Sequence, residues 1–463
     1  MSSPSGHSPL LMPFQPSPQV VSQMTEFNLI QCEGMTPIEE PLPMENETKS
    51  SDYDGDAIER MDITMKISDD PNAAEMNLQV ATLFNQVFDP KPAISASQVG
   101  LRHMSGAMTN RVYITTIDPA PMVMAYRAPR LLRAKAEQNQ QEMVQMPAKY
   151  IVRVYGKGTE AILSREKELF WVNQLTALGF GAQLYTIFGN GRVEQFLECA
   201  TLTMDDMRDE STSRDIAQRL CELHTLVSYR KPFGSTCDKG TEYLNGPPGL
   251  WANVDLWMRL VMNKWPDIRR RCNNNPQCAD ILDNWHQLEQ SICKLKAIIK
   301  REVHSPLVFT HNDLQYGNIL RLQNTGNIEI VDFEFSGYSY RGFDIANHFC
   351  EWMYDYSSKN PHILDLERYP TTEERHNFLR SYVYTKTSID AKIKADQDRP
   401  TEDWISKEVA ELDREVAFFL PASLLHWSVH GLLKACCTEI DFDYIGFAAQ
   451  RLSIFIDQVA KLD

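Results

Sequence analysis

The chain has 463 residues, of which 43% are hydrophobic, and its 62 acidic and 46 basic side chains give a formal net charge of −16. This composition is typical of a globular protein with two or three structural units. The acidic balance disfavours nucleic-acid binding, which needs clustered basic side chains, and no apolar run approaches the ~18–20 residues of a membrane span. The start of the chain lacks signal-peptide features, and the ten cysteines include no C-x-x-C pair. We therefore predict a cytoplasmic protein without membrane insertion.

The beginning of the chain has an unusual charge balance. The first 77 residues contain three basic and fourteen acidic side chains, a net charge of −11. The first fifty are also rich in Pro and Ser and show no sustained apolar periodicity. Such a segment cannot bury enough apolar surface to offset the entropy lost on ordering. We predict that residues 1–70 form a disordered acidic tail.

Residues 71–199 predict a small lobe made mostly of strands. A helix is expected to start at Asp69-Asp70-Pro71, and the Gln-rich stretch 128–148 is expected to be a polar insertion. The buried face of the first helix is predicted from its helical spacing and comprises Met76, Val80, Leu83 and Val87. The expected strands span 99–104, 111–117, 149–155, 183–188 and 192–197, with a helix over about 159–178.

Residues 200–463 predict a larger lobe that is mostly helical. Trp-rich helical stretches are expected near 250–265, 280–300 and 405–435. A strand-rich lobe followed by a helical one predicts a two-lobed α+β architecture.

The most informative motif lies in this second lobe. His311, Asp313 and Asn318 follow an apolar strand with the spacing H-x-D-x-x-x-x-N, and a second strand ends at Asp332. An Asp in such a loop can accept the proton of an attacking hydroxyl, and an Asn with a second Asp can hold the Mg²⁺ that neutralises ATP phosphates. This is the protein-kinase pattern, except that Glu334 replaces the usual Gly. The motif predicts phosphoryl transfer from Mg-ATP, with Asp313 as the base and Asn318 and Asp332 as metal ligands.

The small lobe contains residues suited to nucleotide binding. Arg153 lies in mid-strand, where kinases keep a Lys for the α- and β-phosphates; alternatively it is a solvated Arg at a sheet edge. On the next helix Glu166 shares a stripe with apolar residues, which favours it over Glu168 as the partner of Arg153. The turn between the first two strands can fold its backbone amides over phosphates. Its small and polar residues are Ser105, Gly106, Thr109 and Asn110.

The segment of residues 330–356, which begins at the end of the second strand, identifies a family. It contains the sequences DFE, YRGFDI, NHFCEW and MYDY, and the catalytic loop reads HNDLQYGN. With these motifs the sequence resembles the choline/ethanolamine kinase family from about residue 75 to the end. The resemblance implies a protein-kinase-like fold and transfer of the ATP γ-phosphate to choline or ethanolamine. It also implies a place in phosphatidylcholine or phosphatidylethanolamine synthesis, and a homodimer.

The resemblance extends to individual residues around the nucleotide and the reacting hydroxyl. Gln315 would lie near the hydroxyl that is phosphorylated, and Glu334 would join the metal ligands. Residues 193–197 resemble the hinge between the lobes that contacts adenine, with Gln195 and Leu197 as the contact residues.

The resemblance also implies a pocket for the amine. A quaternary ammonium cannot donate hydrogen bonds, so aromatic faces with a nearby carboxylate hold it best. Any single aromatic residue is more often ordinary core packing. His430 stands where the family usually has a Trp; it would oppose a bound cation if charged and offer a ring if neutral. The residues that match the family's pocket are Glu351, Tyr356, Trp427, Ile440 and Phe442.

Three other functions compete with a choline kinase. An ethanolamine kinase would read a smaller ammonium through carboxylate hydrogen bonds. A catalytically weak relative could act as a scaffold through its acidic tail. The retention of four residues speaks against it: Asp313, Asn318, Asp332 and Arg153. An aminoglycoside phosphotransferase shares the catalytic-loop pattern but not the NHFCEW and MYDY segments. We therefore predict a choline kinase with some activity toward ethanolamine.

Overall fold

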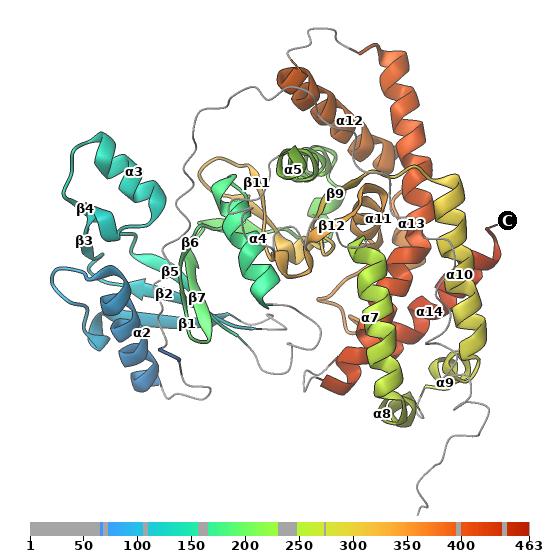
Figure 1. Cartoon of the computed structure of the whole chain (residues 1–463), viewed down its shortest axis with the longest axis horizontal. Helices are drawn as coiled ribbons and strands as arrows, with labels where there is room; N and C mark the ends of the chain where they lie inside the picture. Colours follow the sequence, from blue (N-terminus) through green and yellow to red (C-terminus); the bar gives the residue numbers. More distant parts are fainter. Residues whose placement is uncertain are drawn as a thin grey trace, which may run out of the picture.

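The computed structural model describes residues 65–67, 73–104, 110–155, 165–229, 248–272, 275–394, 400–437 and 442–462. The chain forms two lobes, a smaller one around a β-sheet and a larger one of packed helices (Figure 1). The connection between them runs from β7 (Gly191–Gln195), in the sheet of the small lobe, to β8 (Cys199–Thr201), in the large lobe. This is the predicted two-lobed α+β fold.

The small lobe is built on a five-stranded antiparallel sheet with the strand order β1-β2-β5-β7-β6. All five predicted strands are present within about three residues of their expected ends. Their bounds are β1 Val99–Met104, β2 Asn110–Ile117, β5 Lys149–Tyr155, β6 Leu184–Phe188 and β7 Gly191–Gln195.

The alternation of side chains along β5 decides which of them can face the large lobe. Tyr150, Val152 and Val154 are fully buried in the core of the small lobe. Because successive side chains of a strand point to opposite faces, Arg153 projects from the other face. That face is turned toward α4 (Arg165–Ala177) and the large lobe (Figure 1).

The first helix, α2 (Ala73–Phe88), packs its predicted apolar face into the core of the small lobe. Residues just before it differ from the prediction of a tail that extends to residue 70. Ile67 is 1% exposed, and its backbone N–H and C=O both bond to the Asn190 side chain, at 2.9 and 2.7 Å. The chain is therefore anchored to the turn between β6 and β7 already at residues 65–67, while residues 1–64 lie outside the described part.

The predicted polar insertion has regular structure. A hairpin of β3 (Met122–Met124) and β4 (Met143–Gln145) encloses α3 (Arg130–Gln138). Short 3-10 helices precede β1 and follow β3, at Ala96–Gln98 and Ala125–Arg127. The element is attached to the sheet through fully buried apolar side chains such as Val123 and Met146.

The large lobe contains a helical core and two small antiparallel sheets, of order β11-β10-β8 and β12-β9. At their ends these sheets carry the predicted catalytic loop (residues 311–318) and the predicted metal loop (residues 332–335). The strands are β9 Leu307–Thr310, β10 Ile319–Leu322, β11 Ile328–Ile330 and β12 Gly337–Tyr340. The helices are α5 Glu210–Tyr229, α7 Gly249–Asn263, α8 Trp265–Arg271, α9 Pro276–Asp283, α10 Trp285–Glu302, α11 Arg341–Glu351, α12 Thr372–Lys394, α13 Glu402–Cys437 and α14 Tyr444–Ala460.

The long helix α13 is the centre of the large lobe and packs against α7, α11, α12 and α14. It is long and apolar enough to meet the criteria for a membrane span, but 83% of its most apolar window is buried inside the structure. Helices that are apolar on every side are typical of the interior of a large core. The apolar character of this window is thus explained by its burial in the core of the large lobe.

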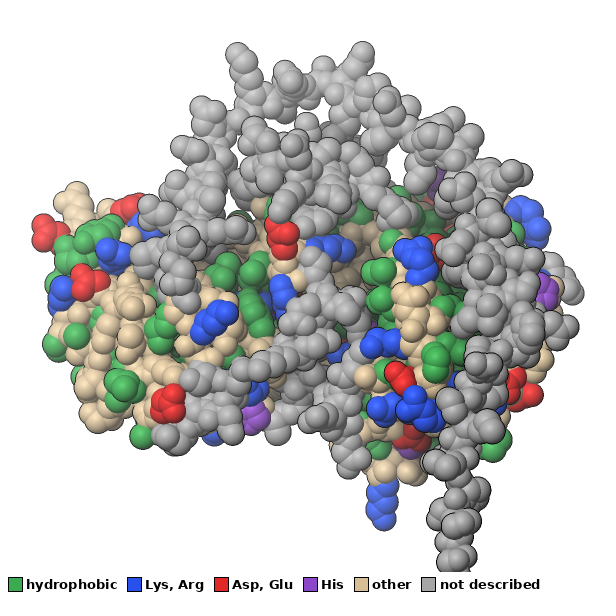
Figure 2. Space-filling view, turned by 60° about the horizontal axis from the view of Figure 1, so that its bottom comes forward, with side chains coloured by type: hydrophobic (Ala, Val, Ile, Leu, Met, Phe, Trp, Pro, Cys, Tyr) green, Lys and Arg blue, Asp and Glu red, His purple; other side chains and the backbone are tan. Residues whose placement is uncertain are grey.

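Charged side chains of both signs are interspersed over the described surface in Figure 2. In the described parts of that face, Lys and Arg side chains do not gather into one extended patch.

Candidate active site

The catalytic loop follows β9 and is held in place by α11. The Asp344 carboxylate accepts hydrogen bonds from the backbone N–H groups of His311 and Asn312, both at 2.7 Å. Burial alone would raise the pKa of Asp344, but hydrogen bonds and the charges around it, first among them His224, hold that pKa below its ordinary value. A fully buried carboxylate thus fixes the backbone just before Asp313.

Asn312 adopts a left-handed backbone conformation with φ of 67°. Its side chain donates to the carbonyl of Phe335 at 2.9 Å. Asn can adopt this conformation at lower cost than most residues, and the bond ties the catalytic loop to the end of the metal loop. His311 adds a second tie, because its Nε2 donates to the carbonyl of Val331 at 3.0 Å.

Asp313 and Asn318 lie together as the motif predicts. The Asn318 amide donates to the Asp313 carboxylate at 3.0 Å and to the Asp313 carbonyl at 2.8 Å. Burial, and then the nearby carboxylates of Glu351, Asp332 and Glu334, raise the pKa of Asp313 well above its ordinary value. The site therefore concentrates negative charge at the position where a hydroxyl would have to be deprotonated.

Asp332 follows β11 in a left-handed conformation, with φ of 69°. One carboxylate oxygen each from Glu168, Asp332 and Glu334 lies within 4.8 Å of the others. Oδ1 of Asp332 is buried and accepts no hydrogen bond from the residues that the structure describes. Clustered carboxylate oxygens, one of them without a donor, fit the oxygen ligands of a hard divalent cation that keeps several of its waters. Glu168 was not among the predicted metal ligands.

A buried network of arginine and glutamate side chains lies behind this cluster. Arg192 is 2% exposed; its guanidinium contacts Glu168 and Glu194, each at 2.6 Å. Arg153 lies opposite Arg192 in the sheet and contacts Glu194 at 3.5 Å and Asp332 at 3.8 Å. Arg153 is thus not a solvated edge residue, since it links the sheet to the metal loop.

The predicted pairing of Glu166 with Arg153 is not found. Glu166 is exposed, whereas Glu168 is 2% exposed and contacts Arg192 at 2.6 Å and Arg165 at 2.7 Å. Successive residues of a helix are rotated by about 100°, so Glu168 lies about 200° around α4 from Glu166, on nearly the opposite side. The predicted i,i+4 stripe was therefore the wrong face, because the side of α4 that carries Glu168 is the buried one. Of the two carboxylates left open by the sequence, Glu168 belongs to the network.

The remaining nucleotide residues lie partly outside the described chain. Ser105, Gly106 and Thr109 fall in the segment 105–109, which the structure does not describe. Asn110 begins β2 and is buried opposite Tyr155. Gln195 ends β7, where its backbone N–H donates to the Gln183 carbonyl at 2.8 Å, and Leu197 lies in the interlobe connection.

Gln315 has a local structural contact in the catalytic loop. Its side chain accepts a hydrogen bond from the backbone N–H of Gly317 at 2.6 Å and caps the 3-10 helix Tyr316–Asn318. That helix ends at Asn318, whose side chain contacts Asp313. The predicted proximity of Gln315 to the acceptor hydroxyl stays a prediction.

One half of the predicted amine pocket surrounds Glu351. This carboxylate is 4% exposed and accepts a hydrogen bond from the Tyr356 hydroxyl at 2.7 Å. The Tyr356 ring stacks on Tyr354 at 5.6 Å and lies 5.6 Å from the Tyr316 ring. Burial raises the pKa of Glu351 above its ordinary value, so a bound cation would favour its ionised form.

The other half gathers aromatic rings on α7, α13 and the metal loop. Trp427 lies 5.2 Å from the rings of both Phe335 and His430. His430 is 8% exposed and also packs against Trp257 at 5.2 Å. Burial lowers the pKa of His430 well below its ordinary value, so this ring is neutral. Of the two alternatives for His430, the neutral ring agrees with the structure.

The last two predicted pocket residues lie near the start of α14. Ile440 falls outside the described residues. Phe442 packs against Tyr444 and Phe447, at 4.7 and 5.6 Å between ring centroids. Phe447 in turn lies 6.3 Å from Tyr354, which connects Phe442 to the tyrosines around Glu351.

Several residues of the site were not predicted. Arg192 and Glu194 occur in a short strand whose first four residues are all buried. The signal that could have found them is a pair of opposite charges two residues apart in a predicted strand, which places both on one face. Tyr316, Tyr354 and Trp257 carried no such signal, because aromatic residues are common in any core.

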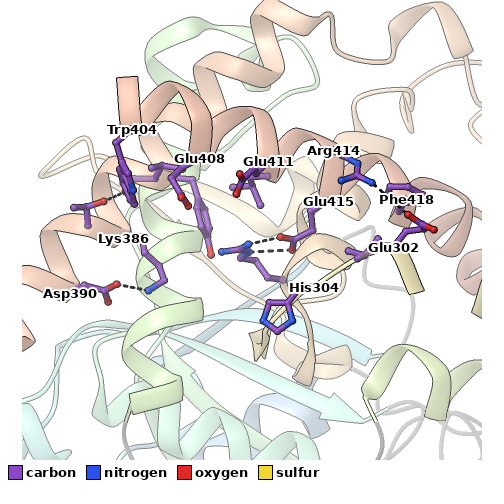
Figure 3. A pocket seen from close by; sticks show the side chains of 16 residues that line it. Glu302, His304, Lys386, Asp390, Trp404, Glu408, Glu411, Arg414, Glu415 and Phe418 are labelled. Atoms are coloured by element: carbon purple, nitrogen blue, oxygen red, sulfur yellow. Dashed lines mark hydrogen bonds and ion pairs between the residues drawn. The ribbon is translucent and has the colours of Figure 1, made fainter. Parts of the chain in front are cut away.

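A second pocket, of about 640 Å³, lies elsewhere on the large lobe. It opens between α12, α13 and the end of α10, and several of its charged side chains pair with one another, as Lys386 with Asp390 and Arg341 with Glu415 (Figure 3). None of the predicted site residues lines it. The candidate active site is therefore the region between the lobes and not this pocket.

Two lobes joined by a short connection between β7 and β8, with the predicted catalytic Asp–Asn pair and metal-loop Asp at the ends of the large lobe's strands, form the arrangement of a protein-kinase-like phosphotransferase. Solved structures agree on the fold: ethanolamine kinase from Plasmodium vivax has a TM-score of 0.61 at 22% identity, covering 84% of this chain and 90% of that one. Choline kinase from Cryptosporidium parvum has a TM-score of 0.60 at 22% identity, covering 83% and 95%.

Sequence comparison gives the particular family. The family model for choline/ethanolamine kinase matches residues 101–456. Probable choline kinase 2 from Arabidopsis thaliana is 32% identical over 303 residues, which cover 65% of this chain and 75% of the relative. Human choline/ethanolamine kinase is 28% identical over 321 residues, covering 68% and 74%. The chain belongs to the choline/ethanolamine kinase family.

Proposed function

We propose that this protein is a Mg-ATP-dependent choline kinase, which transfers the γ-phosphoryl group of ATP to the choline hydroxyl and has lesser activity toward ethanolamine. Its product would be phosphocholine, a precursor of phosphatidylcholine. The observation that carries the proposal is that Asp313 lies near both groups of predicted site residues. The carboxylates of Asp332 and Glu334, and that of Glu351, which accepts a hydrogen bond from Tyr356, all raise the pKa of Asp313.

The nucleotide would lie between the sheet and the metal loop. Arg153, which already reaches toward Asp332 at 3.8 Å, would bind the α- and β-phosphates. Asn318, Asp332 and Glu334 would hold a magnesium ion, and Glu168 lies close enough to the cluster to contact its waters. When bound, that ion supplies positive charge that offsets the negative charge of the phosphates.

Asp313 would orient the acceptor hydroxyl and accept its proton. Its hydrogen bond from Asn318 fixes one carboxylate oxygen and leaves the other available. Burial is the largest cause of the raised pKa of Asp313, and neutralising Asp332 and Glu334 would remove two of the smaller causes, which would favour the ionised form of Asp313. A base within hydrogen-bond reach of the reacting hydroxyl is the geometric requirement for this chemistry.

The amine side favours a quaternary ammonium. Tyr356 and Trp427 offer ring faces, and Glu351 supplies a negative charge. One oxygen of Glu351 already accepts the Tyr356 hydroxyl, which reduces its capacity to accept hydrogen bonds from the primary ammonium of ethanolamine. This supports choline as the preferred acceptor, while the remaining carboxylate oxygen allows ethanolamine to bind.

The proposal is tested by an assay of ADP formation with choline, ethanolamine and an aminoglycoside measured in parallel. We expect the largest kcat/KM with choline, a smaller value with ethanolamine and no turnover of the aminoglycoside. A larger value with ethanolamine would make the protein an ethanolamine kinase. No turnover of any acceptor would favour a scaffold and contradict the proposal.

The family resemblance also leads us to infer a cytoplasmic homodimer. Size-exclusion chromatography with light scattering would give twice the mass of the 53.1 kDa chain if this inference is right, and a single chain mass would contradict it.

A further inference from the structure

We propose that Asn347 is a positioning residue that couples the amine pocket to the catalytic loop; this inference rests on the proposed amine-kinase function. Asn347 lies in the middle of α11 and is 0% exposed. It belongs to the NHFCEW segment, yet neither its position nor its residue type predicts contact with substrate.

The side-chain amide of Asn347 joins three elements. Its Oδ1 accepts hydrogen bonds from the Trp427 indole Nε1 at 2.7 Å and from the Ser423 hydroxyl at 2.8 Å, both on α13. Its Nδ2 donates to the backbone carbonyl of Asn312 at 3.1 Å. One rigid, planar group therefore contacts the tryptophan of the amine pocket at one end and the residue before Asp313 at the other.

The catalytic-loop end of this connection is a residue in an unfavourable backbone conformation. Asn312 has a φ of 67° and is kept there by bonds to Asp344, Phe335 and Asn347. Residues in sparsely populated backbone regions persist only where the surroundings hold them. Loss of the Asn347 bond would remove one of these three contacts and allow the backbone next to Asp313 to shift.

The pocket end of the connection fixes the orientation of an aromatic face. Trp427 is packed edge-on to Phe335 and His430, contacts that do not specify where the indole N–H points. The bond to Asn347 does specify it. A cation is attracted to the ring face, and not to the edge, so rotation of the indole would weaken binding of the amine.

Phosphoryl transfer requires the amine pocket and the catalytic loop to lie at the correct distance from each other. The acceptor hydroxyl lies two carbons from the ammonium nitrogen in choline, so the position of the ring that holds the nitrogen determines where the hydroxyl meets Asp313. A displacement of about 1 Å in such geometry can lower turnover about a hundredfold. Asn347 sets this distance from within the core without contact to either substrate.

The experiment measures kcat, the KM for choline and the KM for ATP in Asn347→Ala, Trp427→Phe and the double variant. We expect Asn347→Ala to lower kcat at least tenfold and raise the choline KM about three- to tenfold, the range of one buried hydrogen bond, with the ATP KM unchanged. Asn347→Ala already removes the hydrogen bond that orients the Trp427 indole. Trp427→Phe should therefore raise the choline KM less in the Asn347→Ala background than in the parent.

Ser423→Ala is the matched control, because it removes the other hydrogen bond to the same oxygen without touching the ring or the loop. It should lower the melting temperature and leave kcat and the choline KM within twofold. Should Asn347→Ala fail to fold, Trp427→Phe and Ser423→Ala decide: the first must raise the choline KM and lower kcat, and the second must do neither.

Effects on the choline KM that multiply in the double variant would overturn the coupling, and so would an Asn347→Ala protein that melts earlier with unchanged kinetics. A parent enzyme that phosphorylates neither amine would instead remove the proposed function, and the inference with it. Parental turnover of choline together with identical kinetics in all variants would overturn only the role of Asn347.

Discussion

Replacing Arg192 with Met should destabilise the small lobe by about 3–5 kcal/mol, because it leaves two buried carboxylates without their shared partner. Arg192 is 2% exposed and contacts Glu168 and Glu194 at 2.6 Å each. Burial would lower the pKa of Arg192, but the charges of Glu194 and Glu168 hold it well above its ordinary value. Glu168 keeps Arg165 at 2.7 Å, so we expect the lower end of the range, about 3 kcal/mol.

The assay is thermal unfolding with measurement of the ATP KM. A loss of about 3 kcal/mol corresponds to a melting temperature roughly 6–12 °C lower for a unit of this size. Arg192 and Arg153 both contact Glu194. Without Arg192, the Arg153 side chain would be drawn toward Glu194 and away from Asp332, so the ATP KM should rise about fivefold or more.

Two further variants make the result specific. The double variant Arg192→Met with Glu194→Gln removes charge from both sides and should recover part of the lost stability, because the cost comes from an uncompensated buried carboxylate. Arg270→Met removes an exposed arginine whose side chain is 73% exposed and contacts Asp267, and should leave the melting temperature nearly unchanged. An Arg192→Met protein with parental melting temperature and ATP KM would refute this reasoning.

Three other results are expected. Asp313→Asn should lower turnover about 10²–10⁴-fold, as loss of a general base does, while nucleotide binding measured by titration is retained. Turnover within tenfold of the parent would show that Asp313 is not the general base. Asp332→Ala should abolish activity across a magnesium titration, and a parental magnesium dependence would show that the metal assignment is wrong. Deleting residues 1–64 should leave the melting temperature unchanged, whereas deleting 1–70 removes buried Ile67 and should cost about 1.5–3 kcal/mol; equal melting temperatures for the two truncations would contradict the anchoring role.

The sequence alone could determine those features that depend on neighbours in the chain. The spacing from Asp313 to Asn318 spans one tight loop and a 3-10 helix, so the local chain brings the two side chains close together, and they lie 3.0 Å apart. The alternation in β5 likewise follows from the two-residue period of a strand. Strand and helix positions, and with them the two-lobed fold, were predictable for the same reason.

Only the tertiary structure decided which carboxylate faces inward and which distant groups meet. Glu166 and Glu168 are both near the start of α4, and the choice between them depends on how that helix is rotated against the sheet, which packing with residues far along the chain determines. Arg192 lies 24 residues from Glu168, and Trp427 lies 80 residues from Asn347. No local periodicity encodes such pairs, because each depends on the positions that the rest of the core imposes on two separate elements.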